Sequence, residues 1–293
     1  MNNLTELFCD VDDFCQEFIP QWQQQLIASG DKKRSKPSRL SDSEIMTLII
    51  WFHQSNFRNF KHFYLSVVQF YHEEFPQLVS YNRFVELKQS ILIPLTAYLQ
   101  SRYGRVTGIA YVDSTKIEVC HTKRISRNKT FEGIAAIGKS SMGWFYGFKL
   151  HLIVNDQGEL LNVYITKGNT DDREPIPKMT KCIWGKLFGD KGYISQPLTD
   201  YLREQSIQLI TSIKKNMKPK LMTLFDKIML RKRSIIETIN DQLKNISQIE
   251  HSRHRSINNF MVNLVAGLVA YTHQNKKPSI KMPHADKRAL ALF

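Results

Sequence analysis

The chain has 293 residues, 42% of them hydrophobic and 11% aromatic, with 41 Lys and Arg against 27 Asp and Glu and a net charge of +14. Such a chain can bury a substantial core, and its length fits one large domain or two of ordinary size. The excess of positive charge indicates a polyanionic partner, most commonly nucleic acid, although a ribosomal, membrane-surface or merely basic protein would share it.

Cysteine spacing and the apolar runs exclude several classes of protein. Cys9, Cys15, Cys120 and Cys182 form no Cys-x-x-Cys pair and no zinc-ligand spacing, so we expect free thiols in a reducing compartment. The first residues lack the basic and apolar regions of a signal peptide. The longest apolar run, residues 260–271, is too short to cross a bilayer. We therefore expect a cytoplasmic, DNA-associated protein with no membrane partner.

Residues 1–105 are expected to form an all-helical domain. An amphipathic segment covers about residues 4–27, and Ser41 followed three residues later by Glu44 is the signature of a capping box at the start of the next helix. Further helices are expected at about residues 60–71 and 80–91. Compact helices with exposed basic residues fit a helix-turn-helix DNA-binding domain, and they fit a plain helical packing domain equally well.

From residue 106 the pattern changes to short β-favouring runs alternating with turns and helices. Strands are expected at residues 109–119, 144–154, 160–166, 186–190 and 207–213, and helices at 175–179, 196–205, 221–247 and 257–273. The polar, basic residues 121–142 are expected to be a loop. This order predicts a three-stranded meander followed by alternating units, that is, a mixed five-stranded α/β sheet flanked by helices over residues 106–275. A basic tail, residues 276–293, follows.

Three acids stand out within this second region. Asp113 interrupts an apolar strand, Asp190 ends another strand just before a glycine turn, and Glu237 lies on a helix four residues after Arg233. Each has an ordinary explanation, because an Asp often forms a turn and a Glu four residues after an Arg often forms a surface ion pair. Together they suggest something else. Converging carboxylates repel one another unless cations neutralise them, and such a set can hold two Mg²⁺ ions about 4 Å apart for phosphoryl transfer.

The order of these acids and the residues around them resemble the DDE transposases of bacterial insertion sequences. The helix matches their signature at Arg233, Glu237 and Lys244, with Leu230 where the signature has a tyrosine, and Asp190-x-Gly192-Tyr193 is also typical of the group. Phrases nearer the N-terminus, residues 40–46 and 79–84, resemble insertion-sequence family 982 in particular.

This resemblance implies a ribonuclease H-like catalytic domain in which Asp113, Asp190 and Glu237 bind two Mg²⁺ ions, for which Mn²⁺ can substitute. It also implies a double-stranded DNA partner, comprising transposon ends and target site, and at least a homodimer in the synaptic complex. The enzyme would bind the terminal inverted repeats of its element, cleave the DNA ends and join the 3′-hydroxyls to target DNA. A catalytically inactive DNA-binding protein or repressor, and a junction-type nuclease of the same fold, remain alternatives.

Basic residues around these acids are candidates for contacts with DNA phosphates. The candidates are Arg233, Lys244, Lys149, Lys123, Arg124, Arg127, Lys214 and Lys215. Lys149 and His151 alternate onto one face of the second strand, which the meander would place beside Asp113. There His151 is either an auxiliary proton carrier or a satisfied buried histidine. Asp172 is either an auxiliary acid or a helix cap.

Overall fold

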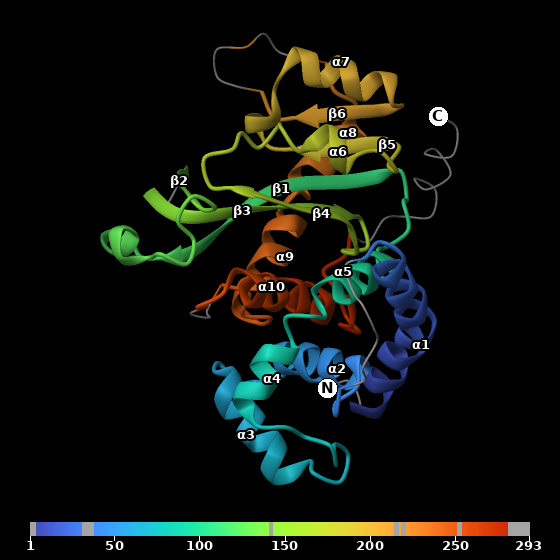
Figure 1. The fold of residues 1–293 in the computed structure, drawn as a ribbon. Helices are drawn as coiled ribbons and strands as arrows, with labels where there is room; N and C mark the ends of the chain where they lie inside the picture. The colour runs from blue at the N-terminus through green and yellow to red at the C-terminus, as the bar shows by residue number, and fades with distance from the viewer. Residues whose placement is uncertain are drawn as a thin grey trace. The chain divides into compact units, whose positions relative to one another are not determined.

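The computed structural model describes residues 4–30, 38–140, 143–213, 217, 221–250 and 254–280 (Figure 1). The chain divides into two compact units. The first consists of Met1–Arg102 with Leu243–Asn275, and the second of Tyr103–Gln242 with Lys276–Phe293. This division differs from the expected domains, because Leu243–Asn275 group with the N-terminal helices and not with the sheet.

The first unit is all-helical. Its helices are α1 (Leu4–Ala28), α2 (Asp42–Gln54), α3 (Phe60–Phe70), α4 (Tyr81–Leu87), α5 (Leu92–Ser101) and α10 (Ile257–Thr272). The capping box at α2 is confirmed, since Ser41 Oγ accepts from Glu44 N at 3.1 Å and the Glu44 carboxylate accepts from Ser41 N at 2.7 Å. The buried helix α10 packs against α2 and α5. No helix within the described ranges is long and apolar enough to span a bilayer.

The helix expected at residues 80–91 is shorter in the structure, and a further helix that the sequence did not predict follows it. α4 ends at Leu87 and α5 begins at Leu92. Pro94 lies in the first turn of α5, where its missing N–H costs nothing, whereas the same proline in the interior of a continued α4 would break a hydrogen bond. The apolar positions continue across the break, so their periodicity did not reveal it.

The second unit is built on a six-stranded mixed sheet. Its strands are β1 (Ile109–Cys120), β2 (Ala136–Ser140), β3 (Gly143–Asn155), β4 (Leu160–Lys167), β5 (Gly185–Gly189) and β6 (Ile207–Thr211). The order is β2-β3-β1-β5-β6, and β4 pairs with β3. β3 runs antiparallel to β1, β2 and β4, whereas β1, β5 and β6 are parallel. The predicted fold class, a ribonuclease H-like mixed sheet flanked by helices, is confirmed.

The sixth strand, β2, lies in the segment expected to be a loop, and that prediction was wrong. Residues 122–127 form a short 3₁₀ helix, η1 (Thr122–Arg127), and β2 then pairs with the start of β3. Glycine and lysine are poor strand formers, so local propensity gave no signal for β2. Gly138 is required there by packing, since a Cβ would lie 2.1 Å from the carbonyl oxygen of Gly168.

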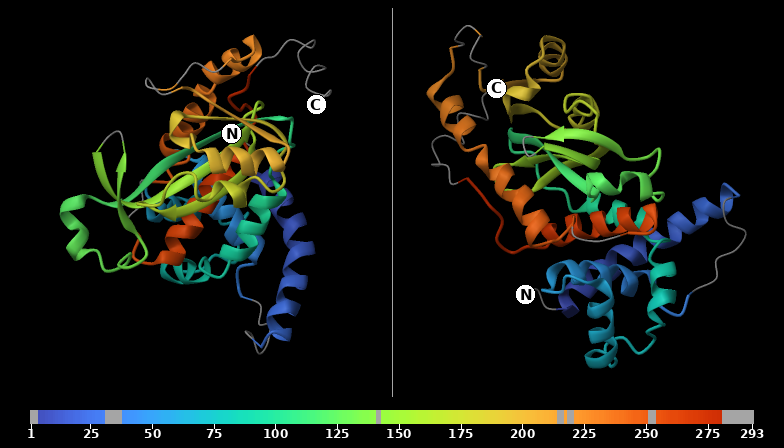
Figure 2. Two further views of the ribbon diagram at one scale, coloured as in Figure 1. Left: turned by 90° about the horizontal axis from the view of Figure 1, so that it is seen from above. Right: turned by 90° about the vertical axis from the view of Figure 1, so that its left-hand side faces the viewer.

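The two faces of the sheet are covered by different helices. Ala110 and Val112 of β1 belong to a core with buried side chains of α6 (Ile176–Met179) and α7 (Gln196–Glu204). Tyr111 points to the opposite face, where its ring stacks on Phe188 at 5.4 Å and its hydroxyl donates to Met229 of α8 (Leu224–Arg231). The right-hand view of Figure 2 shows α8 and α9 (Ser234–Asn245), in orange, along one side of the strands.

The helix expected at residues 221–247 is two helices in the structure, α8 and α9, with a turn at Lys232 and Arg233. Lys186 of β5 holds α8 by a buried ion pair to Asp226 at 2.7 Å, and Ile236 and Ile239 of α9 are fully buried. The turn lets both helices bury their apolar stripes. Because those stripes are nearly continuous in sequence, periodicity alone predicted one helix.

Candidate active site

Asp113 lies in the middle of β1 on the face covered by α8 and α9. Because side chains alternate along a strand, Asp113 follows Tyr111 toward these helices, while Val112 and Ser114 point to the other face. Asn240 of α9 donates from Nδ2 to Asp113 Oδ2 at 3.2 Å. The strand therefore continues past its acid and carries it within the sheet.

Asp190 follows the carboxyl end of β5, the parallel neighbour of β1. Tyr111 pairs with Phe188, so counting two residues along both chains brings Asp113 and Asp190 to the same level. Asp190 begins a single 3₁₀ turn, η2 (Lys191–Tyr193), and its Oδ1 accepts from Gly192 N at 2.7 Å. A Cβ on Gly192 would lie 2.8 Å from that oxygen, so a glycine is needed for this close approach.

Glu237 lies in the first turn of α9 and forms an ion pair with Arg233, which lies in the turn before that helix. Arg233 donates from Nη2 to Glu237 Oε1 at 2.6 Å, and the two side chains are 24% and 55% exposed. The i, i+4 spacing that suggested a surface ion pair does form one. Arg233 is the more buried partner, and its charge also acts on Asp113.

The electrostatics of Asp113 join these groups into one cluster. Burial raises the pKa of Asp113 to about 6, because a carboxylate loses its hydration, while the Arg233 guanidinium and the backbone N–H of Ser114 act in the opposite direction. The negative charges of Asp190 and Glu237 raise it further. The structure thus brings the three predicted acids within electrostatic reach of one another, with one guanidinium among them.

The side chains of this cluster can be compared with the donor atoms that a metal ion requires. Across the described ranges, no group of three His, Cys, Asp or Glu side chains is arranged to hold one ion. The positive charge next to the acids is Arg233, which holds Glu237. The donor chemistry nevertheless fits a hard cation, because the groups are carboxylates together with a buried amide oxygen, Asn240 Oδ1, that has no hydrogen-bond partner.

A family model for the transposase DDE domain matches residues 103–257, more than half of the chain. The chain belongs to this family. No curated protein matches it. The matched range begins at the first residue of the second unit and includes Asp113, Asp190 and Glu237. Transposases of this family bind DNA and generally use divalent metal ions, which agrees with the basic composition of the chain.

The opposite face of the DDE domain sheet carries Lys149 and Asp172. Lys149 Nζ donates to Asp172 Oδ1 at 3.0 Å and to the Thr170 carbonyl at 2.8 Å. Ser114 Oγ donates to the same Asp172 oxygen at 2.9 Å. Asp172 does not cap α6, since no side chain caps that helix, so the cap interpretation was wrong. It ties the segment after β4 to β1 and β3.

His151 lies on this same face and is fully buried. Its Nε2 hydrogen-bonds with Thr166 Oγ1 at 2.8 Å, and its Nδ1 has no partner. Burial lowers the pKa of His151 to about 4; the Asp172 charge opposes this shift and the Lys149 charge adds to it. His151 is therefore neutral near pH 7. It pairs in register with Ser114 and points away from the Asp113 side of the sheet.

The other predicted DNA contacts are scattered over the DDE domain and the first unit. Lys123, Arg124 and Arg127 are exposed on η1. Lys244, at the end of α9, lies 3.2 Å from Glu250, which neutralises its charge. Lys214 and Lys215 lie outside the described residues.

Sequence reasoning missed Asn240, a buried residue of the site, and gave no role to Tyr193, which is buried in the core of the opposite face. Asn240 is three residues after Glu237, so the helical period places both on one face of α9, which was an available signal. Tyr193 was noted only as part of a motif. Its ring packs on Gly189 and Val112, and its buried hydroxyl has no hydrogen-bond partner. Burial, followed by the charges of Asp113, Asp172 and Asp190, raises the pKa of Tyr193.

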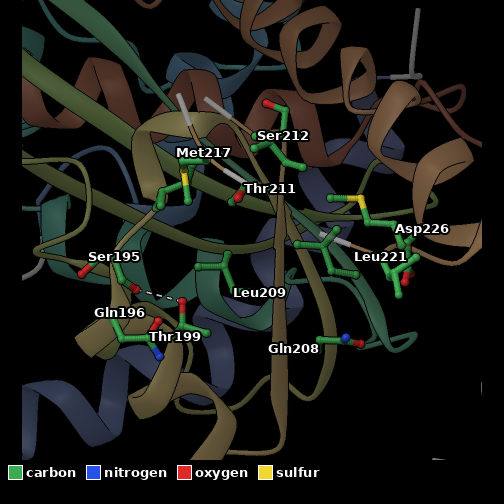
Figure 3. A pocket seen from close by; sticks show the side chains of 14 residues that line it. Ser195, Gln196, Thr199, Gln208, Leu209, Thr211, Ser212, Met217, Leu221 and Asp226 are labelled. Carbon is green, nitrogen blue, oxygen red and sulfur yellow. Dashed lines mark hydrogen bonds between the residues drawn. The ribbon is translucent and has the colours of Figure 1, made fainter. Parts of the chain in front are cut away.

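A surface pocket of about 230 Å³ lies beside β6, away from the acids (Figure 3). Ser195, Gln196 and Thr199 line it from the start of α7, and Gln208 to Thr211 line it from β6. Thr199 Oγ1 is turned back to the Ser195 carbonyl at 2.8 Å. None of the three acids is among its lining residues, so we do not assign the chemistry of the DDE domain to this pocket.

Proposed function

We propose that this chain is a DNA transposase of a bacterial insertion sequence, similar to insertion-sequence family 982. It would bind the terminal inverted repeats of its element, cleave the DNA ends hydrolytically and join the freed 3′-hydroxyls to target DNA. The observation that carries this proposal is the placement of Asp113 level with Asp190, with Glu237 and Arg233 acting on the same buried carboxylate, inside a DDE domain.

In this proposal Asp113, Asp190 and Glu237 hold two Mg²⁺ ions, which Mn²⁺ can replace. The ions supply an activated nucleophile and stabilise the leaving oxygen of an in-line displacement. Arg233 donates to Glu237 Oε1, and its guanidinium would also suit a phosphate oxygen of DNA bound beside the acids.

The remaining parts of the proposal concern DNA. The helices of residues 1–105 would read the terminal repeats, with a helix-turn-helix as the proposed motif, and exposed cations such as those of η1 would bind the phosphate backbone. Synapsis of two ends would take a homodimer or a larger assembly. Double-stranded DNA is the partner at both the transposon end and the target.

The deciding experiment is Mg²⁺-dependent cleavage and strand transfer by the full chain on end DNA. Asp113→Ala, Asp190→Ala and Glu237→Ala should each reduce product by roughly 10³-fold or more, because each removes a ligand of the catalytic ions. DNA affinity should stay within about twofold, since backbone contacts dominate it. Asp200→Ala, an exposed acid on α7, is the matched control and should keep full activity. Full activity in all three variants would refute the assignment.

The second candidate is a DNA-binding protein that no longer cleaves. The observation in its favour is the Arg233–Glu237 ion pair, which occupies one of the three acids. It predicts tight binding of end DNA with no metal-dependent product from the unmodified chain. A junction nuclease, the other alternative, would cut branched DNA without joining, and the same assay with a branched substrate separates it from a transposase.

A further inference from the structure

Asn240 is an uncharged side chain that touches the central acid. It is 8% exposed, and its Nδ2 donates to Asp113 Oδ2 at 3.2 Å. Its other amide atom, Oδ1, is enclosed and has no hydrogen-bond partner. Buried polar atoms normally have partners, because an unpaired one loses its hydration without compensation. An orphaned oxygen beside a cluster of acids therefore needs an explanation.

The position of this amide is fixed by the fold. Asn240 follows Ile239 and lies one helical turn after Ile236, and both isoleucines are fully buried, so α9 cannot turn without opening the core. The orientation of the amide is fixed by chemistry, since its NH₂ group must face the ionised Asp113 oxygen and two facing oxygens would repel. Oδ1 therefore points away from Asp113 and remains available as an acceptor.

A purely structural role does not account for an amide here. Packing alone would be served by leucine, which has a similar volume and leaves no orphaned oxygen. A fourth carboxylate would add to the repulsion already acting among Asp113, Asp190 and Glu237. An amide holds one acid and adds an oxygen donor without adding negative charge, which is what a hard divalent cation among three carboxylates can use.

We propose that Asn240 belongs to the cation site of this DDE domain, as a positioning residue for Asp113 through Nδ2 and as a neutral oxygen donor toward the divalent cation through Oδ1. This inference rests on the proposed function, because it takes the acid cluster to be the metal site. It extends the set of acids to include an amide that lies on the same helix face as Glu237.

The experiment measures Mn²⁺ binding to the full chain by electron paramagnetic resonance of the free ion, without DNA. Asn240→Ala and Asn240→Leu should weaken Mn²⁺ binding about 10-fold or more, the usual effect of losing a group that orients a metal ligand. Gln242→Ala is the matched control, since Gln242 also lies on α9 with a buried oxygen that has no hydrogen-bond partner, and this variant should bind Mn²⁺ as the unmodified chain does.

The outcomes separate this inference from the proposed function. Unchanged Mn²⁺ affinity in both Asn240 variants, together with loss of binding in Asp113→Ala, would overturn the role of Asn240 and leave the metal site in place. Unchanged affinity in Asp113→Ala as well would overturn both. Asn240→Leu preserves side-chain volume, so it decides the question if Asn240→Ala does not fold, and circular dichroism unfolding of each variant shows whether stability has changed.

Discussion

Adjacent residues of β1 place polar clusters on opposite faces of one sheet, and the two clusters differ in how completely they are satisfied. On one face, Asp172 receives hydrogen bonds from Lys149 and Ser114, and Lys149 also donates to a backbone carbonyl. On the other face, Asp113 receives hydrogen bonds from the Asn240 amide at 3.2 Å and from the backbone N–H of Ser114, and it lies near two further acids.

The difference separates a structural cluster from a binding site. A network whose charged groups are paired with one another, as Asp172 is with Lys149, rigidifies the elements it joins, here β1, β3 and the segment after β4. Carboxylates that lie close together without such pairing cost free energy in the protein alone, and a ligand of the right charge offsets that cost. By this criterion Asp172 and Lys149 support the sheet, and we infer that the Asp113 cluster is the part that binds a cation.

The largest effect that would sharpen this contrast is a gain in stability from removing the charge of Asp113. Its pKa of about 6 lies above the ordinary 3.8, so ionisation opposes folding as pH rises through that window and above it. Asp113→Asn should therefore raise the free energy of unfolding of the metal-free chain by about 2–3 kcal/mol at pH 8, and by less than about 1 kcal/mol near pH 4. Urea unfolding at both pH values measures this.

Asp172→Asn is the control on the opposite face. It should lower stability, because it weakens an ion pair whose lysine is largely buried. If Asp113→Asn destabilised the chain at pH 8 as Asp172→Asn does, the two clusters would be alike and the contrast would fail.

A smaller effect concerns His151, which burial keeps neutral. Its pKa of about 4 lies below the ordinary 6.5, so the unfolded chain takes up a proton first as pH falls, and stability is lost between about pH 6.5 and 4. At pH 5 this loss is about 2 kcal/mol. His151→Gln should remove that part of the acid sensitivity, whereas His62→Gln, at an exposed position, should leave the unfolding profile unchanged. An identical profile for His151→Gln would show that His151 does not stay neutral in the folded chain.

Much of this architecture was predictable because it depends on local patterns. The strand carrying Asp113, the hairpin of β3 and β4 and the cap at Ser41 follow from alternation, turn chemistry and capping preferences. β2 and the breaks after Leu87 and Arg231 did not follow from such patterns. β2 forms because β3 offers it an edge, and the breaks interrupt apolar stripes that run on in sequence.

The site divides in the same way. Residue types and order indicated Asp113, Asp190 and Glu237, but the face on which each neighbouring residue lies depends on strand register. Lys149 and His151 were placed beside Asp113 on alternation within β3 alone. In the observed register, Asp113 pairs with Leu152 and Ser114 pairs with His151. The side chains of Lys149 and His151 therefore lie on the face opposite to Asp113. Asn240 was missed because its role depends on a contact across 127 positions of the chain.

The smallest predicted effect tests whether Ser114 and Asp113, which are adjacent on β1 but face opposite sides of the sheet, act independently. Ser114→Ala removes one of the hydrogen bonds to Asp172 and should cost about 1 kcal/mol of unfolding free energy. Because Lys149 still holds Asp172, the cluster should weaken without coming apart. Mn²⁺ affinity at the Asp113 face should stay as in the unmodified chain, measured as for the Asn240 variants. A clear loss of Mn²⁺ affinity in Ser114→Ala would mean that the satisfied cluster positions Asp113 through β1, and that the two faces work as one site.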